Sequence, residues 1–413
     1  MEKQYPRSSS LPKKQFEWSL ANISNAIIDQ ASKLAPSLWE EDSEQSISAE
    51  DSEYVNSLLS QLNKVNLDLQ SDPKSVTANN GTINVKPQAR SSLTKIHRDS
   101  NLDFWIEYLN DSEGKRDKYK QLVIAKVRAS PIPYQLRKQV WVMLSAANLN
   151  SAVPLYKQLL EMTSPCEREI LLDIHRTFPD HDMFKDKDGE GQMALFRILK
   201  AYSIYDSTLG FCQGMPFCVG PLLMQNIPEE EVFALFISMM GRIPRNPILD
   251  ALKWDYSINK QEGTRSLFTT GLDGLDLILY QHSYLVAELL PDLAEHFTEF
   301  GVAPSTYATQ WFLTFFASCF PIDIVFRIYD IMLAEGPVLT LIRISLAILS
   351  HNQDLILSAN DLELIFEILK GNNLVKSYEG KYELIIEQAV GLSNEINDKV
   401  LKELLLEYNS QFQ

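Results

Sequence analysis

Apolar residues recur at helical spacing along most of the chain beyond about residue 100. Positions three or four residues apart share one face of an α-helix, so such a row predicts a helix with one buried side. Alternating patterns typical of strands are scarce, and no repeat of roughly 20–50 residues is visible. The pattern predicts an all-α fold from about residue 100 onward. Two of its apolar rows are Val325, Ile328, Tyr329 and Met332, and Val400, Leu401, Leu404 and Tyr408.

Turn signals separate the helical stretches, because proline and glycine interrupt helices at characteristic positions. They are Pro131-Ile132-Pro133, Phe178-Pro179, Asp188-Gly189, Ile227-Pro228, Leu290-Pro291 and Glu335-Gly336-Pro337.

The first 100 residues show few sustained patterns. Amphipathic helices are predicted near 20–34 and 54–69, followed by a linker rich in Ser, Asn and Pro. Between Glu40 and Glu53 the chain has seven carboxylates and no basic residue, which is typical of a solvated, disordered tract; a docking segment is the alternative. We therefore expect a largely disordered acidic and Ser-rich extension over 1–100, a main helical domain over 101–345, and C-terminal helices over 346–413 that pack on it.

One uncharged segment, 300–322, has the length of a membrane span. Pro304, Pro321 and several polar residues interrupt it, so we predict a buried core helix instead. The N-terminus has no apolar stretch typical of a secretory signal. The four cysteines lack CxxC or framework spacing and are expected to be reduced thiols, which favours a cytoplasmic location.

The charge excludes one large class of partner. With 38 basic and 54 acidic residues the formal net charge is −16, whereas nucleic-acid binding depends on clustered Lys and Arg. Nucleic acid is therefore not an expected partner.

Sites for independent catalysis are also missing from the sequence. It contains neither GxxxxGK[ST] nor GxGxxG, so no phosphate-binding loop is predicted, and it has no GxSxG. The stretch DKDGEG places Phe184 and Leu195 where a calcium loop needs ligands, so a connecting turn is the better interpretation and no metal is expected. His175 is more typical of a packing residue than of a base. We expect no independent substrate turnover.

Three short stretches remain, and each has a structural as well as a functional interpretation. IPYQLRKQVWVML places Arg137 and Trp141 four apart on one helix face. LLDIHRTFPDHDMF places Arg176 three residues after Asp173 in what we predict to be the last turn of a helix, where an arginine is commonly a cap. LGFCQGMPFCVGPLLM places Gln213 before a long apolar run, where its amide must be hydrogen-bonded or exposed.

Arg176 and Gln213 are 37 residues apart, with one predicted helix, 193–205, between them. Two helices packed through such a connection bring both residues to one rim. GTP hydrolysis by a small GTPase needs an oriented water, which an amide provides, and stabilised phosphoryl charge, which a guanidinium provides. An arginine supplied in trans accelerates this reaction by about 10³–10⁵. The absence of a nucleotide motif fits this chemistry, because the partner holds the GTP and Mg²⁺.

These motifs resemble those of the TBC domain of Rab GTPase-activating proteins, over roughly residues 103–350. The fungal Gyp-type and animal Evi-type subfamily is the most similar, and 306–336 is similar to the family's downstream core helices. The family motif R-x-x-x-W is matched by Arg137 and Trp141; I-x-x-D-x-x-R-T-F-P by Ile170, Asp173, Arg176, Thr177, Phe178 and Pro179; and Y-x-Q-G-M by Phe211, Gln213, Gly214 and Met215.

The resemblance implies a two-lobed helical TBC-type domain with no cofactor of its own, acting on a GTP-bound Rab-family GTPase in vesicle trafficking, including exocytosis. It implies that Arg176 is an arginine finger held by Asp173, and that Gln213 is a second finger. Arg137 and Trp141 are then structural, with Arg137 supporting the loop that carries Gln213. It also implies recruitment through partners to secretory vesicles, Golgi or plasma membrane.

The chain departs from the family pattern in four places. Phe211 replaces a tyrosine, which removes a hydroxyl but keeps the ring. Residues 130–133 read Ser-Pro-Ile-Pro instead of the usual Gly-Ile-Pro entry. Residues 241–266 look longer than typical, which would affect partner choice, and the long C-terminal coiled coil seen in some relatives is not expected from this sequence. Two alternatives stay open: a Rab-binding scaffold without activity, and a helical interaction protein unrelated to GTPases.

Overall fold

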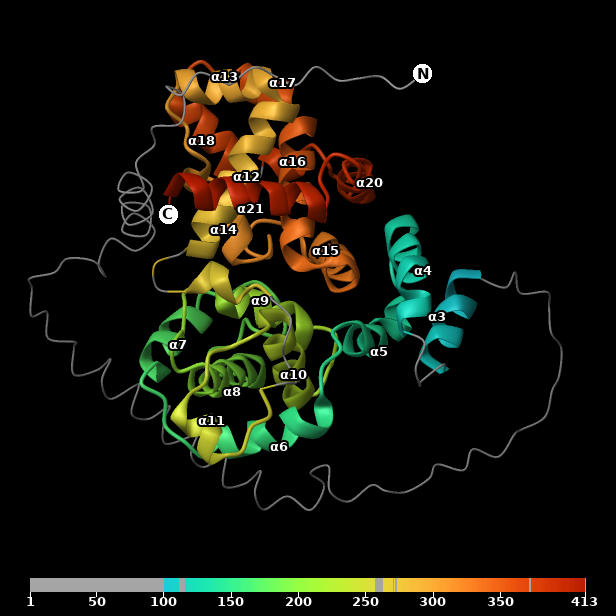
Figure 1. Ribbon diagram of the computed structural model, residues 1–413, viewed down its shortest axis with the longest axis vertical. Helices are drawn as coiled ribbons and strands as arrows, with labels where there is room; N and C mark the ends of the chain where they lie inside the picture. The colour runs from blue at the N-terminus through green and yellow to red at the C-terminus, as the bar shows by residue number, and fades with distance from the viewer. Residues whose placement is uncertain are drawn as a thin grey trace, which may run out of the picture.

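The computed structural model describes residues 100–110, 116–256, 263–269, 271, 273–370 and 373–412. Within these ranges every helix or strand assigned is a helix, which confirms the all-α prediction (Figure 1). The N-terminal predictions, including the acidic tract, the linker and the helices near 20–34 and 54–69, lie outside the described residues.

The helices form two lobes, with a third group beside their junction (Figure 1). The junction group consists of α3 (Ser100–Asn110), α4 (Arg116–Ala129) and α5 (Tyr134–Leu144). The first lobe consists of α6 (Leu149–Leu160), α7 (Glu167–Ile174), α8 (Glu190–Tyr205), α9 (Met215–Leu223), α10 (Glu229–Met240) and α11 (Pro247–Ala251). The second lobe consists of η2 (Arg265–Phe268), α12 (Asp273–Leu289), α13 (Pro291–Glu299), η3 (Pro304–Thr306), α14 (Ala308–Leu313), α15 (Ile322–Glu335), α16 (Pro337–His351), α17 (Gln353–Leu357), α18 (Leu362–Lys370), α19 (Asn373–Lys376), α20 (Glu383–Gly391) and α21 (Asp398–Phe412).

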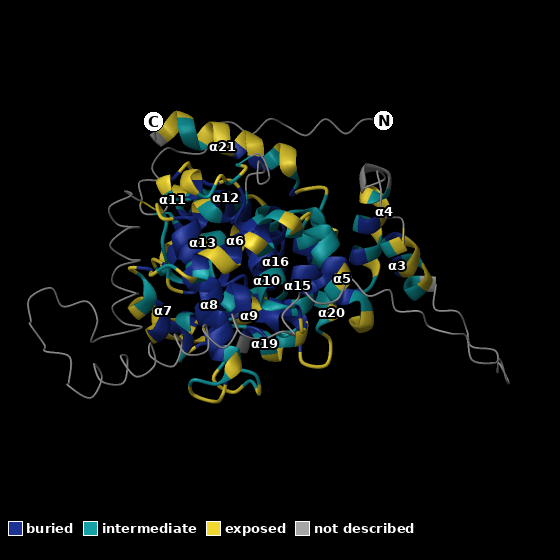
Figure 2. Ribbon diagram, turned by 90° about the horizontal axis from the view of Figure 1, so that it is seen from below, coloured by how far each residue is buried: buried dark blue, intermediate teal, exposed yellow. Residues whose placement is uncertain are grey.

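Helix α8 is the centre of the first lobe and packs against α6, α7, α9 and α10. It is buried on nearly all sides, as expected of a helix with apolar residues around its circumference (Figure 2). Its Arg197 is buried as well, and Arg197 Nη2 donates to Glu229 Oε2 at 2.6 Å and to Glu190 Oε1 at 2.5 Å. These ion pairs make a buried guanidinium acceptable inside the lobe.

Helix α16 has the same role in the second lobe, where α12, α15 and α20 pack around it. Buried polar contacts join α12 and α16 to the residue before α14: His282 Nε2 lies 3.0 Å from the Tyr307 hydroxyl, and His282 Nδ1 lies 3.1 Å from Ser345 Oγ. The domain boundary expected between 345 and 346 falls inside α16, because this helix runs without a break to His351. The C-terminal helices are therefore part of the second lobe's packing.

The uncharged segment 300–322 is largely buried, but it is not the single core helix expected from its composition. It contains η3 and the six-residue α14, and then turns through Phe315 and Phe316, whose φ angles are 48° and 64°. The buried packing of both rings offsets the cost of this left-handed backbone. None of the helices in the described ranges combines the length and apolarity that a membrane crossing requires.

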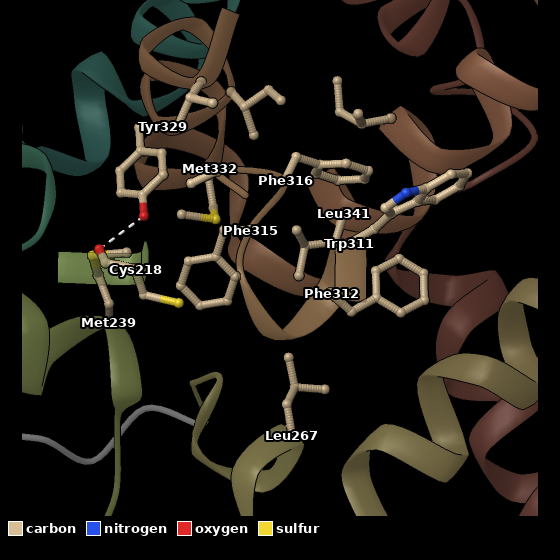
Figure 3. Packing of buried hydrophobic residues seen from close by; sticks show 14 of the residues in the cluster. Cys218, Met239, Leu267, Trp311, Phe312, Phe315, Phe316, Tyr329, Met332 and Leu341 are labelled. Atoms are coloured by element: carbon tan, nitrogen blue, oxygen red, sulfur yellow. Dashed lines mark hydrogen bonds between the residues drawn. The ribbon is translucent and has the colours of Figure 1, made fainter. Parts of the chain in front are cut away.

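The two lobes meet where α9 contacts α15 and the 315–316 turn (Figure 3). The Tyr329 hydroxyl of α15 donates to the Cys218 carbonyl of α9 at 2.8 Å. The Phe315 ring lies 6.3 Å from the Tyr329 ring, centroid to centroid. Apolar packing and hydrogen bonds at Cys218, including one from its thiol to the Leu313 carbonyl at 3.3 Å, therefore hold α9 against the second lobe.

Candidate functional site

Arg176 lies two residues beyond the end of α7, not in its last turn as predicted, because the helix ends at Ile174. Its Nε donates to Asp173 Oδ1 at 2.5 Å. The Asp173 side chain is only 3% exposed, whereas the Arg176 side chain is 41% exposed. Within the described part of the chain the terminal Nη groups of Arg176 have no partner, so the fork of the guanidinium is left open at the surface.

The second oxygen of the same carboxylate binds the segment that carries Gln213. The backbone N–H of Gly214 donates to Asp173 Oδ2 at 2.9 Å. Gln213 itself is exposed, and among the described residues its side-chain amide has no hydrogen-bond partner. One buried carboxylate thus fixes both the arginine and the backbone next to the glutamine, which places Arg176 and Gln213 at one rim.

Gly214 is required by the backbone at this point. It is the N-cap residue directly before α9 and has a φ of 97°, a conformation that glycine adopts without strain. A Cβ there would lie 3.4 Å from the Leu313 carbonyl oxygen and 3.4 Å from Thr314 Cγ2. The end of α14 packs closely on Gly214 and thereby fixes the backbone position from which the Gln213 side chain extends into solvent.

The segment 210–214 runs beside α7 from its first residues to its last. At one end, a Cβ on Gly210 would lie 3.2 Å from the sulfur of Cys166, which precedes α7. At the other end, Gly214 binds Asp173. The predicted site residue Phe211 lies between these points, half-buried, with its ring packed against the apolar core. Packing is thus maintained without the tyrosine hydroxyl.

The Phe-Pro stop after Arg176 attaches its loop to α9. Phe178 has a φ of 48°, and its ring lies 5.1 Å from that of Phe217 and 5.8 Å from that of Phe184. The ring also covers Gly220, where a Cβ would lie 2.4 Å from Phe178 Cε2. Gly220 therefore leaves the space that lets the loop carrying Arg176 lie against α9.

Two further side chains with chemical potential, His175 and Cys212, lie next to Arg176 and Gln213 in the sequence. His175 Nδ1 lies 3.2 Å from Gln192 Oε1, and Gln192 Nε2 in turn donates to the Phe184 carbonyl at 2.8 Å, so His175 takes part in the scaffold. Burial, together with the Asp173 charge, raises the pKa of Cys212 to about 11. That thiol is protonated at neutral pH and is a poor nucleophile. Nowhere in the described ranges do three His, Cys, Asp or Glu side chains gather as a metal site would require.

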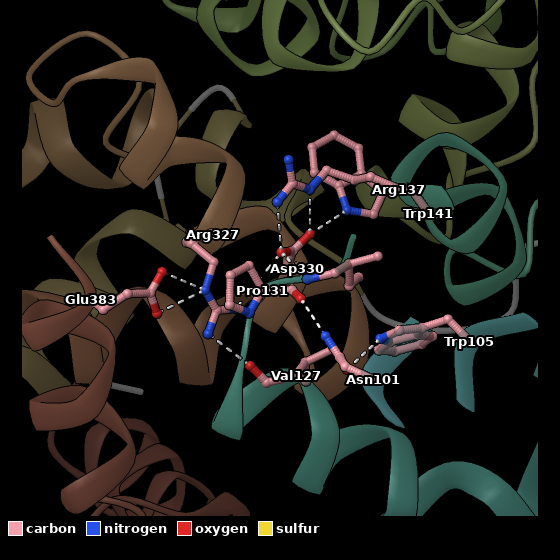
Figure 4. A network of polar contacts seen from close by, with 10 residues as sticks. Asn101, Trp105, Val127, Pro131, Arg137, Trp141, Arg327, Asp330 and Glu383 are labelled. Atoms are coloured by element: carbon pink, nitrogen blue, oxygen red, sulfur yellow. Dashed lines mark hydrogen bonds and ion pairs between the residues drawn. The ribbon is translucent and has the colours of Figure 1, made fainter. Parts of the chain in front are cut away.

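Arg137 and Trp141 lie away from the rim, in the cluster shown in Figure 4. Arg137 Nε donates to Asp330 Oδ1 at 3.2 Å, and Trp141 Nε1 donates to the same oxygen at 2.7 Å. The Ile132 N–H donates to Asp330 Oδ2 at 3.2 Å. Burial raises the pKa of Asp330, and Arg137 and Arg327 oppose this rise by stabilising the carboxylate.

This geometry corrects the role expected for Arg137. It does not support the Gln213 loop directly, because its guanidinium is used to fasten α5 to Asp330 of α15. The link to the rim is indirect: the Trp141 ring stacks 5.5 Å from Tyr329, which donates to Cys218 of α9. Asp330 was missed in the sequence, although a carboxylate within the apolar stretch FRIYDIML is a usable signal of a buried ion pair.

The longer stretch expected over 241–266 is described only in part. It contains α11, and its Asn246 Nδ2 donates to the Tyr205 carbonyl at 2.8 Å. Residues 257–262 lie outside the described ranges. Its effect on partner choice stays a prediction.

A family model and the related proteins found by sequence comparison indicate the same family. A family model described as "Rab-GTPase-TBC domain" matches residues 134–357. The chain is 34% identical over 360 residues to the Homo sapiens "Ecotropic viral integration site 5 protein homolog", which covers 86% of this chain and 41% of that protein. It is 35% identical over 257 residues to the Caenorhabditis elegans "Rab GTPase-activating protein tbc-11", covering 61% of this chain and 25% of that protein. The chain thus spans less than half the length of these relatives.

Solved structures support the fold. The crystal structure of the Ypt/Rab-GAP domain of Gyp1p aligns with a TM-score of 0.55 at 18% identity, covering 70% of this chain and 98% of that one. The Chlamydomonas flagellar RabGAP TBC domain aligns with a TM-score of 0.54 at 24% identity, covering 70% of this chain and 90% of that one.

Proposed function

The chain belongs to the Rab-GTPase-TBC domain family, and on that premise we propose that it accelerates GTP hydrolysis by a GTP-bound Rab-family GTPase, with Arg176 and Gln213 completing the partner's active site. One observation carries the proposal. The Asp173 carboxylate binds Arg176 through Nε and the Gln213 segment through the Gly214 N–H, so the Arg176 Nη groups and the Gln213 amide remain available at one rim.

The two free groups match the two needs of phosphoryl transfer. The Nη donors of Arg176 would bind the phosphoryl oxygens, on which negative charge is spread in the transition state. The Gln213 amide would accept from the attacking water and donate to a phosphoryl oxygen, which orients the water. The ion pair with Asp173 fixes the guanidinium before the partner arrives, which reduces the entropy lost on reaching the transition state.

The nucleotide and its ion would come with the partner. GTP and Mg²⁺ would both be held by the GTPase, and this chain would contribute only the two side chains and the surface that positions them. On this proposal the protein alone turns over no GTP. Its place in vesicle trafficking, its cytoplasmic location and its recruitment to secretory membranes through partners belong to the same proposal.

Single-turnover GTP hydrolysis with a panel of purified, GTP-loaded Rab GTPases tests it. Wild type should accelerate at least one of them, and Arg176→Ala should lower that acceleration by about 10³-fold or more, with binding retained. Arg176→Lys should also fail, because lysine keeps the charge but loses the planar fork. Gln213→Ala should lower the rate with no change in thermal unfolding, and Gln139→Ala, an exposed glutamine on α5, is its matched control.

The alternative, a binding scaffold without activity, predicts a different pattern. In that case wild type binds a GTP-loaded Rab but accelerates none, and Arg176→Ala changes nothing in hydrolysis. Acceleration by wild type together with full activity in Arg176→Ala would refute the arginine-finger assignment.

A further inference from the structure

One leucine on α7 is exposed although its neighbours are buried. Ile170, Leu171 and Ile174 are at most 3% exposed and face the first lobe's core. Leu172, directly before Asp173, is 52% exposed. The core already takes the inward face of α7, so packing within the chain leaves much of the Leu172 side chain uncovered.

Leu172 stands in a row that ends at the proposed finger. Residues four apart on a helix lie above one another on the same face. Arg168 and Leu172 follow this spacing on α7, and Arg176 comes four residues after Leu172, in the turn just beyond the helix; all three are exposed. Arg168 takes part in no ion pair within the described part of the chain. The segment 210–214 runs beside the same helix, with Gly210 next to Cys166 and Gly214 bound to Asp173.

The proposed function places this row inside an interface. A guanidinium that enters another protein's nucleotide site brings the surface around it into contact with that protein. A standard interface covers about 800 Å² on each partner, equivalent to a disc of about 16 Å radius. Leu172 and Arg176 are four residues apart, and four residues span at most about 14 Å even when fully extended, so Leu172 falls within such a disc.

We infer that Leu172 is a binding contact for the GTPase: it packs on an apolar side chain beside the partner's nucleotide site, while Arg168 meets a carboxylate next to it. This inference rests on the proposed function and deepens it. A leucine at the edge of an interface is buried equally in the ground-state complex and in the transition state. Leu172 should therefore contribute to affinity and to the choice of partner without contributing to the chemical step.

The experiment compares kcat and KM for the Rab GTPase on which wild type has the highest kcat/KM. Leu172→Ala should raise KM about five- to tenfold with kcat within about twofold of wild type, because it removes the apolar area buried on binding. Leu172→Met, which keeps size and apolarity, should retain the wild-type KM. Leu406→Ala is the matched control, since Leu406 is 69% exposed on α21, which packs on α12 in the other lobe.

The charge part of the inference has its own measurement. Arg168→Glu should raise KM, and the increase should shrink as salt is raised, because exposed ion pairs are screened. A KM for Leu172→Ala equal to that of wild type, or a lower kcat with unchanged KM, would overturn the inference. Unfolding of Leu172→Ala at the wild-type temperature excludes a structural cause for a KM effect.

The inference and the proposed function fail in distinguishable ways. If wild type accelerates no Rab in the panel, the proposed function fails. If wild type is active and Leu172→Ala matches it in KM, only the inference fails and Arg176 keeps its role.

Discussion

Two arginine–aspartate pairs in this molecule have the same chemistry and opposite surroundings. Arg137 is 11% exposed and pairs with Asp330, which is fully buried and also binds Trp141 and the Ile132 N–H. Arg176 is 41% exposed and pairs with buried Asp173 through Nε alone. In both pairs the carboxylate is buried. The pairs differ in the guanidinium, which is buried in Arg137 and extends into solvent in Arg176. The first pair fastens α5 to α15, whereas the second leaves the Nη groups of the guanidinium at the surface, where we propose that they meet the partner GTPase.

Removing Arg137 should show the largest loss of stability. Arg137→Ala leaves Asp330 buried with Arg327 alone as a nearby charge, which we expect to cost about 3–5 kcal/mol of unfolding free energy. Urea denaturation measures this cost. Arg176→Ala is the comparison and should change the unfolding free energy by less than about 1 kcal/mol, since its pair is partly solvated. Equal losses would mean that the two pairs do not differ in role.

Neutralising Asp173 should displace Arg176 and the Gln213 segment without unfolding the protein. Asp173→Asn keeps the shape but loses the charge and one acceptor, so it cannot hold both the Arg176 Nε and the Gly214 N–H. Displacement of the two groups by about 1 Å should lower kcat about 10²-fold. Single-turnover hydrolysis measures this, with binding of the GTP-loaded Rab followed in parallel. An unchanged kcat would mean that Asp173 has no positioning role.

Adding a methyl group at Gly220, under the Phe178 ring, should displace the loop that carries Arg176. In Gly220→Ala the new methyl would collide with the Phe178 ring, and we expect a loss of about 1–3 kcal/mol in unfolding free energy with a lower kcat. Thermal unfolding and hydrolysis rate report the two effects. Replacing the ring by a smaller side chain in the double variant Gly220→Ala/Phe178→Leu should recover part of the lost stability and part of the lost rate. If the double variant is no better than the single one, the loop is held by other contacts.

The smallest effect is expected in the second lobe's interior. Burial lowers the pKa of His282 to about 3, below its ordinary value of 6.5. The folded state thus keeps His282 neutral while the unfolded chain takes up a proton, so its contribution is complete above about pH 6.5 and is lost as pH falls towards 3. Between pH 6 and 5 this amounts to about 1 kcal/mol in unfolding free energy. His282→Gln should flatten this slope in urea titrations; an unchanged slope would assign it to other groups.

The helix content and the three motifs could be predicted from the sequence because they depend on the spacing of residues within short stretches of chain. Apolar spacing predicts helices wherever the core is reached from one side, and Arg137 and Trp141, four apart, do share a face and contact the same carboxylate. The same reasoning failed at 300–322, where a turn through Phe315 and Phe316 replaces a helix. Composition predicts burial there, but two aromatic residues with positive φ are acceptable only because surrounding packing holds their rings.

Local apolar spacing was enough to predict the all-α class and the helix that separates Arg176 from Gln213, and the family resemblance implied the pairing of Asp173 with Arg176. Three features came only from the packed fold: the second oxygen of Asp173 accepts from the Gly214 N–H, Arg137 pairs with Asp330 of α15, and Leu172 is exposed while Leu171 is not. These contacts join residues 41 and 193 positions apart or depend on which face the core occupies. Such contacts follow from how whole helices pack, which local sequence does not encode.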